Sequence, residues 1–318
     1  MQRIIVTALL LAALACASNP RASASTTSSR PLVDHHQHLF SPAIHAYNSA
    51  LPQRDARAVV AQLDSVGIRR AAVLSVAYMY ANPNRPPVEH ELEKVRAENA
   101  WTAAQVAEFP GRLVGVCSVN PLKEYALDEI ARCAANPNLR AALKMHFGNS
   151  DVQLDDTAHV ARLRRVFQAA QQHRMGIVIH MRSSVTRKRP YGAATARAFL
   201  DLLVPAAPDV PIQIAHLAGA GGYDDPGVDS AVAVFVDAVK RGDPRMRNVY
   251  FDISGGIASS RERHALVVQR IRELGIERML YGSDAAVSVV DEYASFHTLP
   301  LTADEFRRIE SNVAPYMR

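Results

Sequence analysis

The segment Leu32–Phe40 places three histidines and one aspartate between apolar residues. In a β-strand, alternate side chains point to the same face, so we expect Asp34, His36 and His38 on one face. The intervening His35 points to the other face and is expected to be structural. Two imidazoles two residues apart can bind one cation, and histidine nitrogen is a standard zinc ligand. Taken alone, the segment fits a surface histidine cluster as well as a metal site.

Later apolar runs end in polar side chains that could join the same site. His180 ends one run, His216 ends another, and Asp284 ends a third. In a fourth run, Lys144 and His146 share one strand face. Because the polar residue is at or near the end of each run, the pattern favours a shared site over scattered surface polarity.

Beyond residue 30, apolar runs alternate with longer helical patterns, which is typical of βαβ units and a parallel sheet. The expected strands are Leu32–His38, Arg70–Ala77, Leu113–Val119, Ala141–His146, Ile177–Arg182, Ile212–Leu217, Val249–Ser254 and Met279–Asp284. The expected helices include Ala56–Val66, Val88–Phe109, Ala158–Arg174, Ala193–Leu203, Asp229–Lys240 and Arg263–Leu274. Eight strands with helical crossovers predict one α/β domain, a (β/α)8 TIM barrel. The connections that follow the strands are long, which predicts an active site at the carboxyl ends of the strands.

Taken in order, these residues resemble the motifs of the amidohydrolase superfamily, specifically the amidohydrolase-2 branch with its aminocarboxymuconate-semialdehyde decarboxylase-like enzymes. The Asp-x-His-x-His motif of the first strand is matched by residues 34–38. The histidines that close strands five and six are matched by His180 and His216, and the aspartate that closes strand eight by Asp284. The resemblance extends from about residue 31 to the C-terminus. It implies a barrel with a mononuclear metal site.

The resemblance also implies roles for individual side chains. The expected ligands of one divalent transition metal, Zn²⁺ by expectation, are His36, His38, His180 and Asp284. A catalytic zinc takes about three protein ligands and keeps a position for water, whose pKa it lowers to about 7. Asp284 would also accept the proton of this water and deliver it to the leaving group. His216 is expected to orient or deprotonate the water; a second metal-ligand role and a purely structural role are its alternatives.

Three side chains are candidate substrate-binding groups: Arg182, His146 and Lys144. The fork of donors on Arg182 suits a carboxylate, and a salt bridge at the rim is the alternative. His146 is likewise expected either to bind the substrate or to form a polar contact at the rim. Lys144 would bridge two metals if it were carboxylated, as in dinuclear members of the superfamily, but a mononuclear site is the prediction. Asp252 and Ser254 are candidates to accept the second N–H of metal-bound imidazoles.

The N-terminus predicts export. Arg3 precedes the apolar run Ile4–Ala15, which is too short to span a bilayer as an anchor. Ala22–Ala24 fits a signal-peptidase site, whereas Cys16, directly after the apolar run, resembles a lipoprotein box. The second alternative would cleave before Cys16 and anchor the protein to the outer membrane through a lipidated cysteine. The expected division is a signal over residues 1–24, a flexible tether over 25–30 and the catalytic domain over 31–318. Both alternatives place the protein in the periplasm.

The composition and charge of the chain indicate which kinds of molecule it can bind. With 318 residues, 48% hydrophobic and 21% charged, the chain can bury a substantial core. The net charge of +5 is modest, and only Arg187–Arg189 forms a basic cluster, so we expect a small-molecule substrate and no nucleic acid. Cys117 lies in an apolar run and is expected to be a buried free thiol, with a bridge to Cys133 as the alternative.

The leading functional expectation is a metal-dependent hydrolase that activates water to cleave a lactone, amide or ester bond in a small substrate, either with or without a carboxylate group. A non-oxidative decarboxylase of an unsaturated or aromatic carboxylic acid is the second candidate. The candidate outside enzymes is a catalytically silent periplasmic metal-binding lipoprotein. Asp284 argues against that candidate, because a storage site needs no carboxylate opposite an open ligand position.

Overall fold

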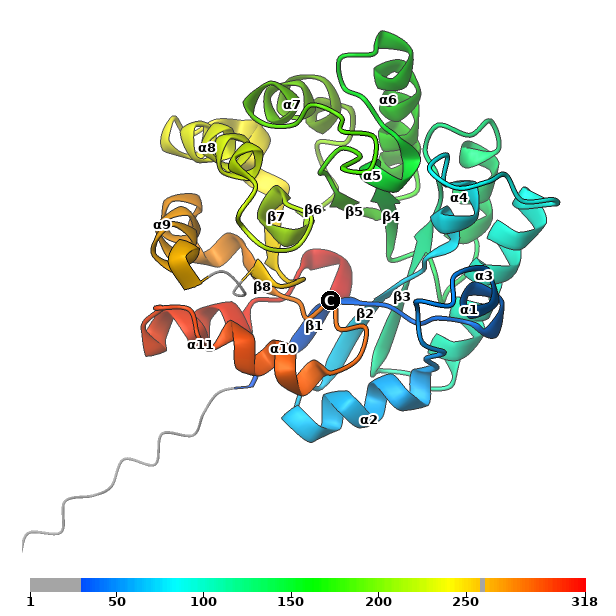
Figure 1. Ribbon diagram of the computed structural model, residues 1–318, viewed down its shortest axis with the longest axis horizontal. Helices are drawn as coiled ribbons and strands as arrows, with labels where there is room; N and C mark the ends of the chain where they lie inside the picture. Colours follow the sequence, from blue (N-terminus) through cyan, green and yellow to red (C-terminus); the bar gives the residue numbers. More distant parts are fainter. Residues whose placement is uncertain (1–29, 258–260) are drawn as a thin grey trace, which may run out of the picture.

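Eight parallel strands form the centre of the molecule in the computed structural model, which describes residues 30–257 and 261–318. The strands are β1 Val33–Gln37, β2 Arg70–Leu74, β3 Leu113–Ser118, β4 Ala142–His146, β5 Gly176–His180, β6 Ile212–Ile214, β7 Val249–Ile253 and β8 Met279–Tyr281. Each strand pairs with the next along the chain, from β1 to β8. The ring closes where the Asp284 N–H, just beyond β8, donates to the His36 carbonyl at 2.7 Å. The predicted (β/α)8 TIM barrel is confirmed (Figure 1).

The helices surround the strands (Figure 1). They are α1 Pro42–Tyr47, α2 Ala56–Val66, α3 Glu91–Ala107, α4 Ala126–Ala134, α5 Phe147–Ser150, α6 Thr157–Gln172, α7 Ala193–Ala198, α8 Pro226–Lys240, α9 His264–Leu274, α10 Val289–Phe296 and α11 Ala303–Ser311. Helix α2 shows how the sequence sets their ends. Asp55 caps its first turn by accepting from the Ala58 N–H at 2.8 Å. Gly67, with φ of 75°, ends it in the left-handed conformation and turns the chain toward β2.

The barrel interior is closed at its base by the C-terminal segment. Ala314 and Met317 pack with inner residues of the strands, among them Leu74 and Val178. His35 ties this segment to the barrel. Its Nδ1 lies 2.9 Å from the Tyr281 carbonyl, and its Nε2 accepts from the Ala314 N–H at 3.1 Å. These contacts give His35 a structural position away from the strand carboxyl ends.

Several strands end earlier than the sequence predicts. β6 ends at Ile214 and β8 at Tyr281, so His216 and Asp284 follow their strands instead of closing them. Both residues have left-handed backbones, with φ of 54° and 50°. Their amides leave the strand ladder because the His216 N–H donates to Asp252 at 2.9 Å and the Asp284 N–H to a carbonyl of β1. Face alternation therefore does not determine where these two side chains point.

Cys117 on β3 and Cys133 on α4 form a disulfide with a Cα–Cα distance of 6.0 Å. The expectation of a free Cys117 thiol is therefore wrong, and the alternative of a bridge holds. The two cysteines are buried in the layer between strands and helices, where β3 faces α4. Closing a loop of about 15 residues stabilises a fold by about 3 kcal/mol in the chain-entropy account.

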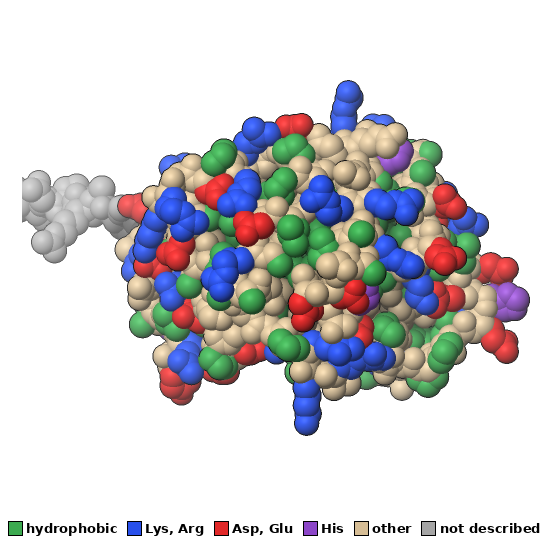
Figure 2. Space-filling model, turned by 90° about the horizontal axis from the view of Figure 1, so that it is seen from above, with side chains coloured by type: hydrophobic (Ala, Val, Ile, Leu, Met, Phe, Trp, Pro, Cys, Tyr) green, Lys and Arg blue, Asp and Glu red, His purple; other side chains and the backbone are tan. Residues whose placement is uncertain are grey.

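The surface carries both signs of charge. Figure 2 shows Lys and Arg side chains interspersed with Asp and Glu over the visible face. Across residues 30–257 and 261–318, no helix combines the length and apolar character needed to cross a membrane. The predicted signal, Cys16 and the tether up to residue 29 lie outside the described residues.

Candidate metal centre and active site

A cavity of about 340 Å³ opens at the carboxyl ends of the strands. Its lining includes seven of the predicted site residues: His36, His38, Lys144, His146, His180, His216 and Asp284. The other lining residues are Phe40, Leu51, Val76, Tyr78, Met79, Asn149, Ala220, Ala285 and Ala286. The fold thus brings together polar residues from β1, β4, β5 and the segments after β6 and β8. This is the position expected for the active site of a (β/α)8 barrel.

Three histidine nitrogens converge on the Asp284 carboxylate. Oδ1 lies 3.4 Å from His38 Nε2 and 3.7 Å from His36 Nε2. Oδ2 lies 3.7 Å from His216 Nε2. Burial by itself raises the pKa of Asp284, but its electrostatic interactions with the surrounding histidines and Lys144 outweigh burial and hold the pKa below its ordinary value. Asp284 is therefore ionised at neutral pH, with three imidazoles around it.

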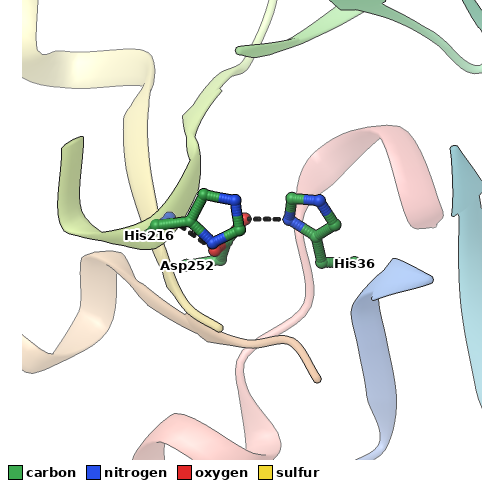
Figure 3. A group of neighbouring side chains, drawn as sticks. All are labelled: His36, His216 and Asp252. Atoms are coloured by element: carbon green, nitrogen blue, oxygen red, sulfur yellow. Dashed lines mark hydrogen bonds and ion pairs between the residues drawn. The ribbon is translucent and has the colours of Figure 1, made fainter. Parts of the chain in front are cut away.

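Asp252 on β7 orients two of these imidazoles (Figure 3). Its Oδ2 lies 3.0 Å from His36 Nδ1, and its Oδ1 accepts from the His216 backbone N–H at 2.9 Å. Ser254 adds a carbonyl 3.2 Å from His216 Nδ1. Burial alone would raise the pKa of Asp252, but its interactions with His36, His216 and Ser254 outweigh burial and hold the pKa far below its ordinary value. Both imidazoles thus donate from Nδ1 to oxygen acceptors, as the sequence analysis expected of Asp252 and Ser254.

His38 is oriented by the backbone of β2. Its Nδ1 lies 2.7 Å from the Leu74 carbonyl, which can only accept a hydrogen bond, so Nδ1 carries the proton. Burial lowers the pKa of His38 to about 3 and that of His216 to about 4, so both rings are neutral at pH 7. Each ring therefore presents an unprotonated Nε2 toward Asp284. A lone pair in this position is what a metal ligand requires.

Lys144 on β4 lines the cavity and is 1% exposed. Its Nζ is 3.1 Å from His36 Nε2. Burial lowers the pKa of Lys144 to about 8, against the opposing charges of Asp284 and Asp252. A metal bound at His36 would have to displace this ammonium group, while the lone pairs of His38 and His216 face Asp284 without it.

His180 lies in the same cavity but outside the tightest groups. Among the described residues, the clusters whose donor atoms lie within 4.8 Å of one another include His36 with His38 and Asp284, and His36 with His216 and Asp252. The His180 ring instead stacks on His146, with centroids 3.8 Å apart and planes at 16°. Its centroid is 5.1 Å from that of His216. The structure therefore places His180 on the opposite wall from His38.

Arg182, a predicted substrate-binding residue, and Asp34, expected on the strand face of His36 and His38, do not line the cavity. Arg182 donates from Nε to Asp225 at 2.8 Å and lies over the Tyr191 ring at 4.8 Å, so its contacts are those of a rim salt bridge. Strand β5 ends at His180, and the alternation that would have aimed Arg182 over the metal does not continue. Asp34 accepts from the Ser283 N–H at 3.0 Å and from Gln37 Nε2 at 2.8 Å, so its carboxylate is engaged by neighbouring polar groups.

Gly255 is a site residue that the sequence analysis missed. Its φ is 65°, and an added Cβ would lie 2.7 Å from His216 Nδ1 and 3.3 Å from Asp284 Oδ2. Only glycine fits this position, since any side chain would push the imidazole out of place. The sequence signal was Gly255–Gly256 directly after the expected strand seven. Tyr78 and Asn149 also line the cavity and come from short helical turns, Ala77–Ala81 and α5, that carry no motif.

The fold and the site define a (β/α)8-barrel enzyme with a histidine and aspartate cluster at its mouth. The amidohydrolase family model matches residues 33–312, and the chain belongs to this family. A search of curated proteins finds no match.

Solved structures with the same fold include decarboxylases and a hydrolase. 5-Carboxyvanillate decarboxylase from Sphingomonas paucimobilis has 18% identity, covers 89% of this chain and 97% of its own, and gives a TM-score of 0.61. Dihydroxybenzoic acid decarboxylase from Polaromonas sp. JS666, with bound manganese and 2-nitroresorcinol, has 16% identity, coverages of 89% and 95%, and a TM-score of 0.61. A probable 2-pyrone-4,6-dicarboxylic acid hydrolase from Acinetobacter baumannii has 16% identity, coverages of 88% and 96%, and a TM-score of 0.57. At these identities the similarity concerns the fold.

The donor set fits a divalent transition metal. Imidazole nitrogen and carboxylate oxygen suit zinc, manganese and iron alike. The histidines around Asp284 present unprotonated nitrogens, and their other nitrogens are held by oxygen acceptors, which is the usual arrangement of metal-binding histidines.

Proposed function

We propose that this protein is a metal-dependent hydrolase that cleaves a lactone, amide or ester bond in a small carboxylated substrate. The observation that carries the proposal is the convergence of three imidazole nitrogens, from His36, His38 and His216, on the ionised carboxylate of Asp284. Such a site can bind a metal and also hold a base beside it.

In this proposal the metal ligands are His36, His38, His180 and Asp284. One bound metal would supply Lewis acidity and a more acidic water. Asp284 accepts a proton from the nucleophile and returns it to the leaving group. His216 orients the nucleophile through Nε2, because its Nδ1 is held by Ser254. We propose one metal per chain and Zn²⁺ as the ion, with Mn²⁺ as the alternative suggested by the manganese-bound relative.

A non-oxidative decarboxylase is the second candidate. The buried cation of Lys144 and the aromatic side chains of Phe40 and Tyr78 line the same cavity, and together they suit an aromatic carboxylate. Two of the similar structures are decarboxylases of such acids by name. In this reaction Asp284 would first accept a proton from water or from a substrate hydroxyl and then pass that proton to the carbon that loses CO₂.

One assay separates the two reactions. Purified protein loaded with Zn²⁺ or Mn²⁺ is offered lactones, esters, amides and aromatic carboxylic acids, and both acid release and CO₂ release are followed. Acid release without CO₂ supports the hydrolase, and CO₂ release supports the decarboxylase. Metal-loaded protein that is inactive on the whole panel would favour the silent metal-binding protein.

We also propose that the protein is exported to the periplasm, with membrane anchoring through Cys16 as one form. The Cys117–Cys133 disulfide supports an oxidising compartment. Cell fractionation and the mass of the mature N-terminus test this, with Cys16→Ser as the control for lipidation. Mature protein found in the cytoplasm with an intact N-terminus would contradict it.

A further inference from the structure

We propose that His146 is a fixed hydrogen-bond donor that binds the carboxylate of an aromatic substrate through its Nε2–H. This inference rests on the proposed function, since it specifies how the same cavity selects its substrate. It names the atom, His146 Nε2, that would recognise the carboxylate of the ligand.

The tautomer of His146 follows from a backbone contact. The Asn149 N–H donates to His146 Nδ1 at 3.1 Å, which makes His146 the side-chain cap of α5. A backbone N–H can only donate, so Nδ1 is unprotonated and the ring proton is on Nε2. The local fold thus fixes His146 as a donor at Nε2, the reverse of His38, whose Nδ1 donates to a carbonyl.

The ring is also held in place. It stacks on His180 with centroids 3.8 Å apart, and the Tyr78 ring lies 5.2 Å away. Gly148 leaves room for it, because a Cβ there would lie 3.3 Å from His146 Cε1 and 3.1 Å from the Arg182 carbonyl. Within residues 30–257 and 261–318, Nε2 has no hydrogen-bond partner, while the side chain is partly exposed and lines the cavity. A pre-positioned donor without a protein partner complements an oxygen acceptor on the ligand.

The surroundings indicate an aromatic carboxylate. Phe40, Val76, Tyr78 and Met79 supply an apolar and aromatic wall, and the cavity of about 340 Å³ is in the range that holds one small molecule. The Lys144 ammonium, which has three donors and uses one toward His36, supplies positive charge. A planar ring therefore fits the wall while its carboxylate accepts from His146.

Two substitutions distinguish the two roles of His146, which are hydrogen-bond donation from Nε2 and capping of α5 through Nδ1. His146→Asn keeps an acceptor near the place of Nδ1, and asparagine is a favoured helix cap, but it removes the Nε2 donor. His146→Gln places an amide N–H near the place of Nε2. His159→Asn is the matched control, because His159 Nδ1 also accepts a backbone N–H, from Gln153 at 3.1 Å, on the outer helix α6.

Benzoate binding to the metal-loaded protein is measured by calorimetry, alongside melting temperature. A hydrogen bond to a charged group is worth about 10- to 100-fold in affinity. We therefore expect His146→Asn to weaken benzoate binding by about that factor at unchanged melting temperature. His146→Gln should retain most of the affinity, and His159→Asn all of it. Nitrogen NMR of histidine-labelled protein should show His146 protonated at Nε2.

Three results would overturn the proposal: no benzoate binding to the wild type, unchanged binding in His146→Asn, or a His146 protonated at Nδ1. Failure of the proposed function looks different. In that case the protein lacks metal or turnover, while benzoate binding still depends on His146.

Discussion

The two halves of the barrel mouth are built differently. On the side of β1, β6, β7 and β8, every imidazole is fixed by an oxygen acceptor. His36 is held by Asp252, His38 by a backbone carbonyl and His216 by Ser254. On the side of β2, β4 and β5, the rings of Tyr78, His146 and His180 mainly pack against one another.

This difference separates two tasks. Oxygen acceptors that fix an imidazole also fix which nitrogen keeps a lone pair, and a metal site needs that precision. We call the side with His36, His38, His216 and Asp284 the metal half, and the side with Tyr78, His146 and His180 the aromatic half. The aromatic half leaves hydrogen-bond donors and flat ring surfaces available for a ligand. The side of β6 and β8 also contains two left-handed residues, His216 and Asp284, whose side chains line the cavity.

The largest effect is expected for Asp284→Asn, which tests whether the metal half performs proton transfer. A general acid–base group contributes about 10²–10⁴-fold, so kcat should fall by at least 10²-fold. Bound metal should fall far less, since the imidazoles remain. The rise of kcat/KM with pH should vanish or move in the variant. Kinetics and metal analysis of the same preparations measure both, with exposed Asp291→Asn on α10 as the control. Near-normal kcat would exclude Asp284 as the base.

Stability against pH tests the packing of α3 on the segment after β1, where Glu98 is buried against Ser41. Burial raises the pKa of Glu98 to about 7, although Ser41 donates to it at 2.6 Å. The raised pKa stabilises the fold below pH 4.5, the ordinary value, and this stability is lost as pH rises through 7. Glu98→Gln should therefore remove about 3 kcal/mol of pH dependence.

Denaturant titrations of wild type and Glu98→Gln between pH 4 and 8 measure the difference between the two curves. Glu93→Gln on the exposed face of the same helix is the control. A constant difference across this pH range would mean that Glu98 is ionised in the folded protein and that its buried surroundings tolerate the charge.

A smaller effect is expected for Asp252→Asn, which keeps the shape of the metal half but weakens the acceptor of His36 and His216. Loss of such an outer partner typically costs about 10- to 100-fold in metal affinity. Competition with a chelator measures the affinity. Asp229→Asn, which breaks a salt bridge to Arg270 outside the cavity, is the matched control. Equal metal affinity in Asp252→Asn and wild type would mean that the orientation of His36 does not depend on this carboxylate.

The sequence predicted the barrel and the residues at its mouth because the period of the strands and the order of the polar residues are local properties. It did not predict which atoms face the cavity. The acceptor of His38 is a backbone carbonyl of β2, and Asp284 reaches the site through a left-handed turn, so neither could be deduced from strand alternation. Arg182 was misplaced because β5 ends two residues before it. The Cys117–Cys133 bridge depends on how α4 packs on β3, which spacing alone does not give.

The most direct test of a metal centre at His36 and His38 is the metal content of the protein. Wild type purified without chelator should carry about one divalent transition metal per chain, and the His36→Ala/His38→Ala double variant should lose it while remaining folded by circular dichroism. Two metals per chain with a carboxylated Lys144 would replace the mononuclear site by a dinuclear one. Unchanged metal content in the folded double variant would contradict the account.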